Sequence, residues 1–169
     1  QSDLTIVEDD IFADFEHATA PRLAAFDGLN RVVHIGSFSK TLSASARCGF
    51  IAAPRDWIEG LTDLKIATTF GGGRLAAELV LTLLKDGSYR KHMDLLRAKL
   101  ARAMAETGTR LKAIGITPWI DHPAGLFLWC SLPDDVDAAD VARRALADNV
   151  VLAPGNAFSL SGTAGRFLR

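Results

Sequence analysis

The sequence has few residues of the kinds that bind metals or form disulfides. Only two cysteines, Cys48 and Cys130, occur among 169 residues, and their separation matches no metal-binding or redox motif. The four histidines include no pair at His-x-His or His-x-x-x-His spacing. We therefore expect no metal site, and we expect both cysteines to be buried free thiols in a reducing cytoplasm.

Long hydrophobic runs and an excess of one charge are also absent. Although 49% of the residues are hydrophobic, no apolar stretch approaches the roughly 20 residues that a membrane-spanning helix needs. The formal net charge is −1 at pH 7, so the composition does not indicate a nucleic-acid-binding surface. We expect a soluble protein, cytoplasmic and without a membrane partner, that is long enough for one domain or two small ones.

Two apolar runs that end in polar residues indicate a pair of strands. Residues 4–10, LTIVEDD, end in carboxylates, and residues 31–39, RVVHIGSFS, end in hydroxyls. The first run is typical of a strand buried on both faces. The segment between them predicts a short helix or turn closed by Asp27 and Gly28. This order favours parallel pairing, and open parallel sheets bind ligands at the carboxyl ends of their strands.

The rest of the chain alternates strand and helix patterns. Further strand candidates are the short apolar runs 47–54, 116–120, 125–132 and 150–154. Helical spacing covers 55–69, 74–87, 88–114 and 137–149. The fold class is therefore α/β. We expect two parts, 1–86 and 87–169, joined by the long amphipathic helix 88–114.

The stretch GSFSK places two hydroxyls and an amine directly after a predicted strand. It is not a P-loop, because serine and not glycine precedes Lys40. Ser37 and Lys40 meet the Ser-x-x-Lys pattern of penicillin-binding proteins, but the Ser-x-Asn and Lys-Thr-Gly elements of that chemistry are missing. The remaining interpretation is that Lys40 forms a Schiff base with an aldehyde cofactor.

Four other side chains fit that interpretation. Ser37 and Ser39 offer hydroxyls to a cofactor's phosphate, and Arg47 offers a planar guanidinium that can make two hydrogen bonds with it. Asp9 follows the neighbouring predicted strand, where a carboxylate can keep a cofactor's ring nitrogen protonated. The residues thus predict a phosphate-bearing aldehyde cofactor at the ends of two strands.

The chain resembles the fold-type I aminotransferases (class I/II) that depend on pyridoxal 5′-phosphate. The resemblance lies in four motifs, which occur in the order EDDIF, GSFSKTLSASARCG, PAGLFLW and APGNAF. The residues of these motifs are similar to those in the aminotransferase-type domain of MocR-like regulators of the GntR class, and to those in related stand-alone aminotransferases. The resemblance implies the second half of a large domain with a mostly parallel sheet, followed by a small α/β C-terminal domain. It also implies that both ends are cuts in a longer protein, so that the cofactor site is incomplete in this chain.

The resemblance also assigns roles to residues. Lys40 matches the lysine that forms the aldimine, and Asp9 matches the partner of the ring nitrogen. The phosphate ligands are Ser37, Ser39 and Arg47. Arg169 matches the arginine that binds the substrate's carboxylate. Phe12 stands where many members have a tyrosine that hydrogen-bonds the cofactor's ring oxygen, and Ala44-Ser45 replaces the family's Pro-Gly, so the turn before Arg47 must form in another way.

Two functions remain open at this point. The resemblance implies either the ligand-sensing domain of a transcriptional regulator, binding an amino acid or amine through the aldimine at Lys40, or an aminotransferase that acts on an amino acid. Phe12 and the sequence of residues 36–45 favour the regulator. In a regulator, DNA would be bound only by a separate N-terminal domain. Members of the family pair as homodimers, so we expect a homodimer for the full-length protein.

Overall fold

The chain forms two compact units, Gln1–Arg97 and Ala98–Arg169. The computed structural model describes residues 4–120 and 125–169. The expected long helix is α4 (Ser88–Ala113), and the division between the units falls inside it. In the described part of the chain, no helix is both long and apolar enough to cross a membrane.

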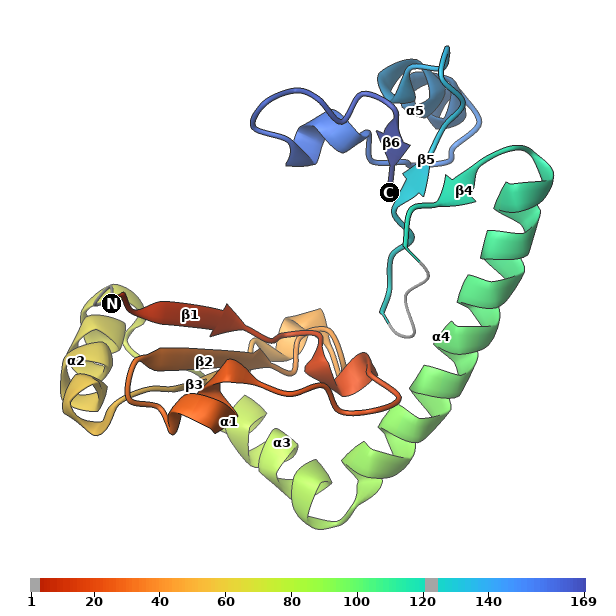
Figure 1. Cartoon of the computed structure of the whole chain (residues 1–169). Coiled ribbons are helices and arrows are strands. Elements are labelled where there is room, and N and C mark those ends of the chain that lie inside the picture. Colours follow the sequence, from red (N-terminus) through yellow and green to blue (C-terminus); the bar gives the residue numbers. More distant parts are fainter. Residues whose placement is uncertain (1–3, 121–124) are drawn as a thin grey trace. The chain divides into compact units, whose positions relative to one another are not determined.

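The first unit contains a three-stranded sheet in the order β1 (Ile6–Asp9), β2 (Val32–Ser37) and β3 (Gly49–Ala52) (Figure 1). β1 and β2 are parallel, as predicted, whereas β3 runs antiparallel to β2. The central strand β2 is the most buried of the three. The predicted burial of the first strand on both faces is wrong, because β1 lies at the edge of the described sheet and leaves Ile6 and Val7 exposed.

Short helices connect these strands and follow them. The helices that lie wholly in this unit are α1 (Leu23–Asp27), α2 (Ile58–Thr69) and α3 (Arg74–Lys85), with the 3-10 turns η1 (Ala13–Phe15), η2 (Ala44–Ala46) and η3 (Arg55–Trp57). The expected closure at Asp27 and Gly28 is confirmed. Gly28 ends α1 with a φ of 65°, a left-handed conformation that glycine adopts without strain. The Asp27 carboxylate accepts a hydrogen bond of 3.0 Å from the Val32 N–H, which ties the turn to the start of β2.

The second unit contains a separate antiparallel sheet in the order β4 (Thr117–Pro118), β5 (Cys130–Ser131) and β6 (Phe167–Leu168). The helix α5 (Ala138–Ala147) begins at Asp137, whose carboxylate accepts hydrogen bonds from the N–H groups of Ala139 and Asp140. The core of this unit is apolar: Leu132, Ala138 and Leu168 are buried, with Ile116, Val136, Val141, Ala142 and Leu152 packed against them.

The strand predicted at 150–154 is not formed as such. Only Pro154 bridges to Leu168, and the 3-10 turn η4 (Gly155–Phe158) begins at the next residue. The pairing goes no further because the backbone turns into η4 at Gly155. The neighbouring residue Ala153 exchanges two backbone hydrogen bonds of 2.9 Å with Arg169, so the end of the chain is held in place.

The two cysteines differ in their burial. Both are free thiols. Cys130 is buried, as predicted, and this burial raises the pKa of its thiol. Cys48 is only half-buried, so the predicted burial holds for Cys130 alone.

Candidate functional site

Three of the residues singled out in the sequence line one pocket of the first unit. Ser37, Ser39 and Arg47 lie on the wall of an open pocket of about 630 Å³, between the end of β2, β3 and the helix α2. Two hydroxyls and a guanidinium are donors that suit a phosphate group, and the guanidinium also supplies positive charge. The donors in this pocket therefore fit the phosphate of the expected cofactor.

The loop after β2 brings these side chains together. Its base is closed by a hydrogen bond of 2.9 Å from the Phe38 N–H to the Cys48 carbonyl oxygen. Within the loop, the Ser37 hydroxyl accepts a hydrogen bond of 3.2 Å from the Ser39 N–H. Because the two ends of the loop are joined, Arg47 returns to the pocket that Ser37 and Ser39 line.

The turn before Arg47 forms without the family's Pro-Gly pair. The residues Ala44–Ala46 make the 3-10 turn η2, and the Ser43 hydroxyl caps it by accepting a hydrogen bond of 3.2 Å from the Ser45 N–H. Arg47 then adopts a φ of 47° and a ψ of 42°, a left-handed conformation that is uncommon for a residue with a side chain. Such strained residues occur often at binding sites, where the surrounding structure holds them in place.

The strand register assigns Asp9 to the same side of the sheet as Ser37. Asp9 pairs with Ile35 across β1 and β2, and side chains of paired residues project from the same face. Ser37 follows Ile35 by two residues, so its side chain also projects from that face. Both Ile35 and Ser37 line the pocket that Ser39 and Arg47 also line. Asp9 and Lys40 are exposed and do not belong to its lining, so the pocket brings together three of the six residues that the sequence assigned to the cofactor.

The remaining two predicted residues occupy other places. The ring of Phe12 lies 6.3 Å from that of the buried Phe15 and carries no hydroxyl that could bond a cofactor. In the second unit, the Arg169 guanidinium lies over two aromatic rings, 4.3 Å from the centre of Phe127 and 4.2 Å from that of Phe158. Arg169 also lines an apolar pocket of about 370 Å³ within that unit.

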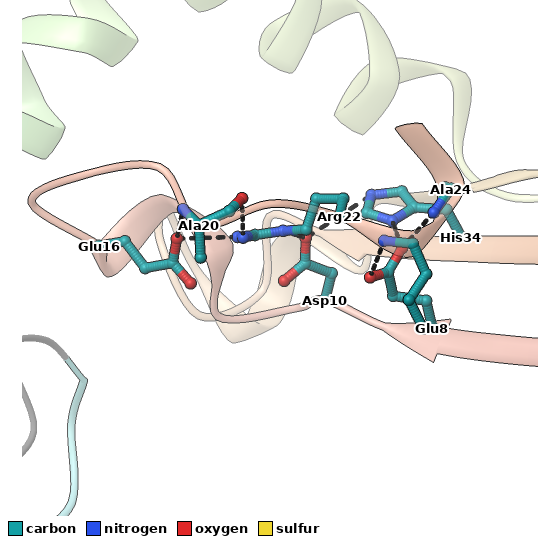
Figure 2. A network of polar contacts seen from close by, with 8 residues as sticks. Glu8, Asp10, Glu16, Ala20, Arg22, Ala24 and His34 are labelled. Atoms are coloured by element: carbon teal, nitrogen blue, oxygen red, sulfur yellow. Dashed lines mark hydrogen bonds and ion pairs between the residues drawn. The ribbon is translucent and has the colours of Figure 1, made fainter. Parts of the chain in front are cut away.

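A charged network on the other face of the sheet was not found from the sequence (Figure 2). Arg22 forms a close ion pair with Asp10 through its Nε atom. Its Nη2 atom lies 3.0 Å from the Glu16 Oε2 atom. The hydrogen bond to Asp10 raises the pKa of the Arg22 guanidinium. Asp10 is therefore occupied by a structural ion pair, which leaves its neighbour Asp9 as the better candidate for a cofactor.

The same network fixes the start of α1. The Glu8 carboxylate accepts hydrogen bonds of 2.8 and 3.0 Å from the N–H groups of Leu23 and Ala24 (Figure 2). These bonds lower the pKa of Glu8. The His34 Nδ1 atom lies 3.5 Å from a Glu8 oxygen and, among the described residues, makes no hydrogen bond. No local sequence pattern marks this network, because most of its partners are distant in the sequence. Arg22 lies 12 residues from Asp10, and Glu8 lies 15 and 16 residues from the two N–H groups that it binds.

Comparison with known proteins gives a match along the whole chain. The family model for aminotransferase class I and II matches residues 1–169. The HTH-type transcriptional regulator NorG of Staphylococcus aureus is 33% identical over 156 residues, which are 90% of this chain and 35% of the regulator. The uncharacterized HTH-type transcriptional regulator YisV of Bacillus subtilis is 30% identical, over 90% of this chain and 32% of that protein. The chain thus spans about a third of the length of these relatives.

Two of the solved structures with the same fold are named as aminotransferases. The α-aminoadipate aminotransferase LysN of Thermus thermophilus, complexed with N-(5′-phosphopyridoxyl)-L-leucine, is 30% identical with a TM-score of 0.84, covering 98% of this chain and 44% of LysN. An aromatic aminotransferase of Pyrococcus horikoshii is 25% identical with a TM-score of 0.87, covering 99% of this chain and 46% of that enzyme. These matches confirm the α/β fold and the family resemblance of the sequence.

Proposed function

The chain belongs to the aminotransferase class I and II family, and on this premise we propose that it is part of a regulator's aminotransferase-type domain that holds pyridoxal 5′-phosphate at Lys40. Pyridoxal 5′-phosphate is the cofactor that the family and its solved relatives imply. The single observation that carries the proposal is the pocket in which Ser37, Ser39 and Arg47 meet, directly before and after Lys40 in the chain.

The phosphate group accounts best for this set of donors. A phosphate carries two negative charges and several acceptor oxygens, and each charge-assisted hydrogen bond to it is worth about 1.5–3 kcal/mol. Ser37 and Ser39 provide hydroxyls from one side of the loop, and Arg47 provides its guanidinium from the other. Lys40 stands one residue beyond Ser39 and its side chain is exposed, so its amine would be the group that bonds the cofactor's aldehyde.

When bound, the cofactor supplies an aldehyde carbon that bonds amines and a ring that draws electrons away from the amine's α-carbon. Lys40 would hold the cofactor through its amine. The same amine would serve as the base for the proton on the α-carbon of a bound ligand. Asp9 keeps the ring nitrogen protonated, a role that its position on the Ser37 face of the sheet supports.

Arg169 is the proposed ligand of the substrate's carboxylate. A guanidinium over two aromatic rings is partly desolvated yet keeps its edge N–H groups available for a carboxylate. The backbone hydrogen bonds of Arg169 with Ala153 hold it in this position. The ligand would accordingly be an amino acid, or an amine that also carries an acid group.

The curated relatives favour a regulator. NorG and YisV are named HTH-type transcriptional regulators, and Phe12 lacks the hydroxyl that many catalytic members use. DNA binding would then belong to a separate N-terminal domain of the full-length protein. The second candidate, a stand-alone aminotransferase, is supported by the 30% identity to LysN. The sequence upstream of Gln1 separates the two, since a winged-helix domain and linker would identify a regulator.

The test uses the visible absorbance of the full-length protein mixed with pyridoxal 5′-phosphate. We expect a visible band in the wild type that Lys40→Ala abolishes, because the chromophore requires the covalent bond to this amine. Lys85→Ala, which removes an exposed lysine at the end of α3, serves as the matched control and should keep the band. A band that survives in Lys40→Ala would refute the assignment.

A further inference from the structure

The loop that carries Lys40 is held by the first turns of α4. Thr41, the residue after Lys40, is only 3% exposed, and its carbonyl oxygen and its hydroxyl are both hydrogen-bonded. Its carbonyl oxygen lies 2.7 Å from His92 Nε2, and its hydroxyl lies 3.0 Å from the hydroxyl of Tyr89. Two residues of one helix therefore fix the backbone and the side chain of Thr41.

Tyr89 is itself fixed from two other directions. Its hydroxyl donates a close hydrogen bond to the Asp14 carboxylate. Burial and this bond raise the pKa of Tyr89, so the phenol stays protonated at neutral pH and remains a donor. The Asp14 carbonyl oxygen in turn accepts a hydrogen bond of 2.8 Å from Arg97, which comes from the same helix as Tyr89.

Tyr89 also contacts the loop on the other side of Lys40. Its ring meets the Phe38 ring edge to face, with the ring centres 5.6 Å apart. Phe38 lies two residues before Lys40, and Thr41 lies one residue after it. The Lys40 side chain is exposed, so the position of its amine depends on how firmly these two neighbours hold the backbone.

We propose that Tyr89 and His92 are positioning residues for Lys40. Tyr89 contacts both Phe38 and Thr41, and His92 contacts Thr41. Through these two neighbours of Lys40 they orient its amine toward the pocket lined by Ser37, Ser39 and Arg47. This inference rests on the proposed function, because it assumes that Lys40 is the attachment point of the cofactor. It adds that the attachment depends on helix α4, whose first turns lie 48 or more residues further along the chain.

The experiment compares three substitutions in the full-length protein. Tyr89→Phe keeps the ring against Phe38 and removes the hydroxyl, whereas Thr41→Val removes the partner hydroxyl with little change in volume. Thr41→Ser keeps a hydroxyl at this position and serves as the conservative control for Thr41→Val. For each protein we would measure amide hydrogen exchange over residues 38–42, and the rate at which pyridoxal 5′-phosphate becomes attached, from the growth of the visible band.

We expect Tyr89→Phe and Thr41→Val to speed exchange in residues 38–42 more than in β2. We also expect them to slow attachment on the order of tenfold, because a reacting group displaced by about 1 Å can lose up to a hundredfold in rate. Thr41→Ser should stay within about twofold of the wild type, since it keeps the hydroxyl bond to Tyr89.

Two results would overturn the positioning role alone: unchanged exchange in residues 38–42, or faster exchange with attachment as fast as in the wild type. A wild-type protein that forms no band, or a Lys40→Ala variant that keeps the band, would instead overturn the proposed function and this inference with it. The two failures are therefore distinguishable in one set of samples.

Discussion

A methyl group added at Gly155 would have no room in the second unit. A Cβ atom there would lie 2.3 Å from the Ala164 carbonyl oxygen and 2.9 Å from the Phe167 carbonyl oxygen. A carbon normally stays about 3.3 Å or more from such an oxygen. Because both obstacles are backbone atoms, Gly155→Ala requires a backbone shift of about 1 Å, between η4 and the segment that leads to Arg169.

The cost follows from the kind of atoms that must move. Overpacking in a protein core costs about 1–3 kcal/mol, and a clash with backbone belongs at the upper end of that range. For a urea dependence of about 2 kcal/mol per M, a loss of about 3 kcal/mol lowers the unfolding midpoint by about 1.5 M. We therefore expect Gly155→Ala to shift the midpoint down by about 1 M or more.

Tryptophan fluorescence in a urea titration provides the assay, because two tryptophans report on the affected segment. The Phe167 ring is stacked on Trp129 at 5.4 Å and meets Trp119 edge to face at 5.2 Å. Gly108→Ala is the matched control in the same unit, since a Cβ there meets nothing within 4 Å. It should raise stability by about 1 kcal/mol, as alanine does in a helix interior. An unchanged midpoint for Gly155→Ala beside a raised one for Gly108→Ala would refute the steric reasoning.

Three further substitutions test the site and the fold. Arg47→Ala should weaken pyridoxal 5′-phosphate binding in a titration about 10- to 100-fold through the loss of charge-assisted hydrogen bonds, and equal affinity would argue against a phosphate site. Glu8 has its pKa lowered from 4.5, so its stabilising effect is present above pH 4.5 and is lost as the pH falls through the folded value; Glu8→Gln should lose less stability than the wild type between pH 7 and pH 3 in urea titrations. Met93 is 1% exposed, so Met93→Ala should lower the free energy of unfolding by about 2–5 kcal/mol in the same titrations. A smaller loss would mean that the surrounding side chains collapse into the space.

The local parts of the fold could be predicted from the sequence, because their signals lie within a few residues. The parallel strands β1 and β2, the Gly28 turn and the helix α4 all follow from apolar spacing and a single glycine. The exposure of β1 could not be predicted in this way, since burial depends on which segments cover a strand and not on its own composition. The missing strand at 150–154 could not be predicted in this way either, because its pairing depends on the distant partner segment and on the turn η4 that follows at Gly155.

The candidate site divides in the same way. Ser37, Ser39 and Arg47 lie within one loop, so their spacing alone indicated that they meet. The hold of Tyr89 and His92 on Thr41 could not be predicted, because it depends on how a distant helix packs against that loop. Arg22 likewise reaches Asp10 across a connection, so this ion pair could not be predicted, whereas the assignment of Asp9 rests on its place after the predicted first strand and on the family resemblance.

The attachment of the cofactor to Lys40 is tested most directly by finding where it becomes bound. The full-length protein would be mixed with pyridoxal 5′-phosphate, reduced with borohydride to make the bond permanent, digested and examined by mass spectrometry. We expect the phosphopyridoxyl group on the peptide that contains Lys40. A label found mainly on Lys65, which lines the pocket of Ser37, Ser39 and Arg47, or spread over exposed lysines, would contradict the assignment.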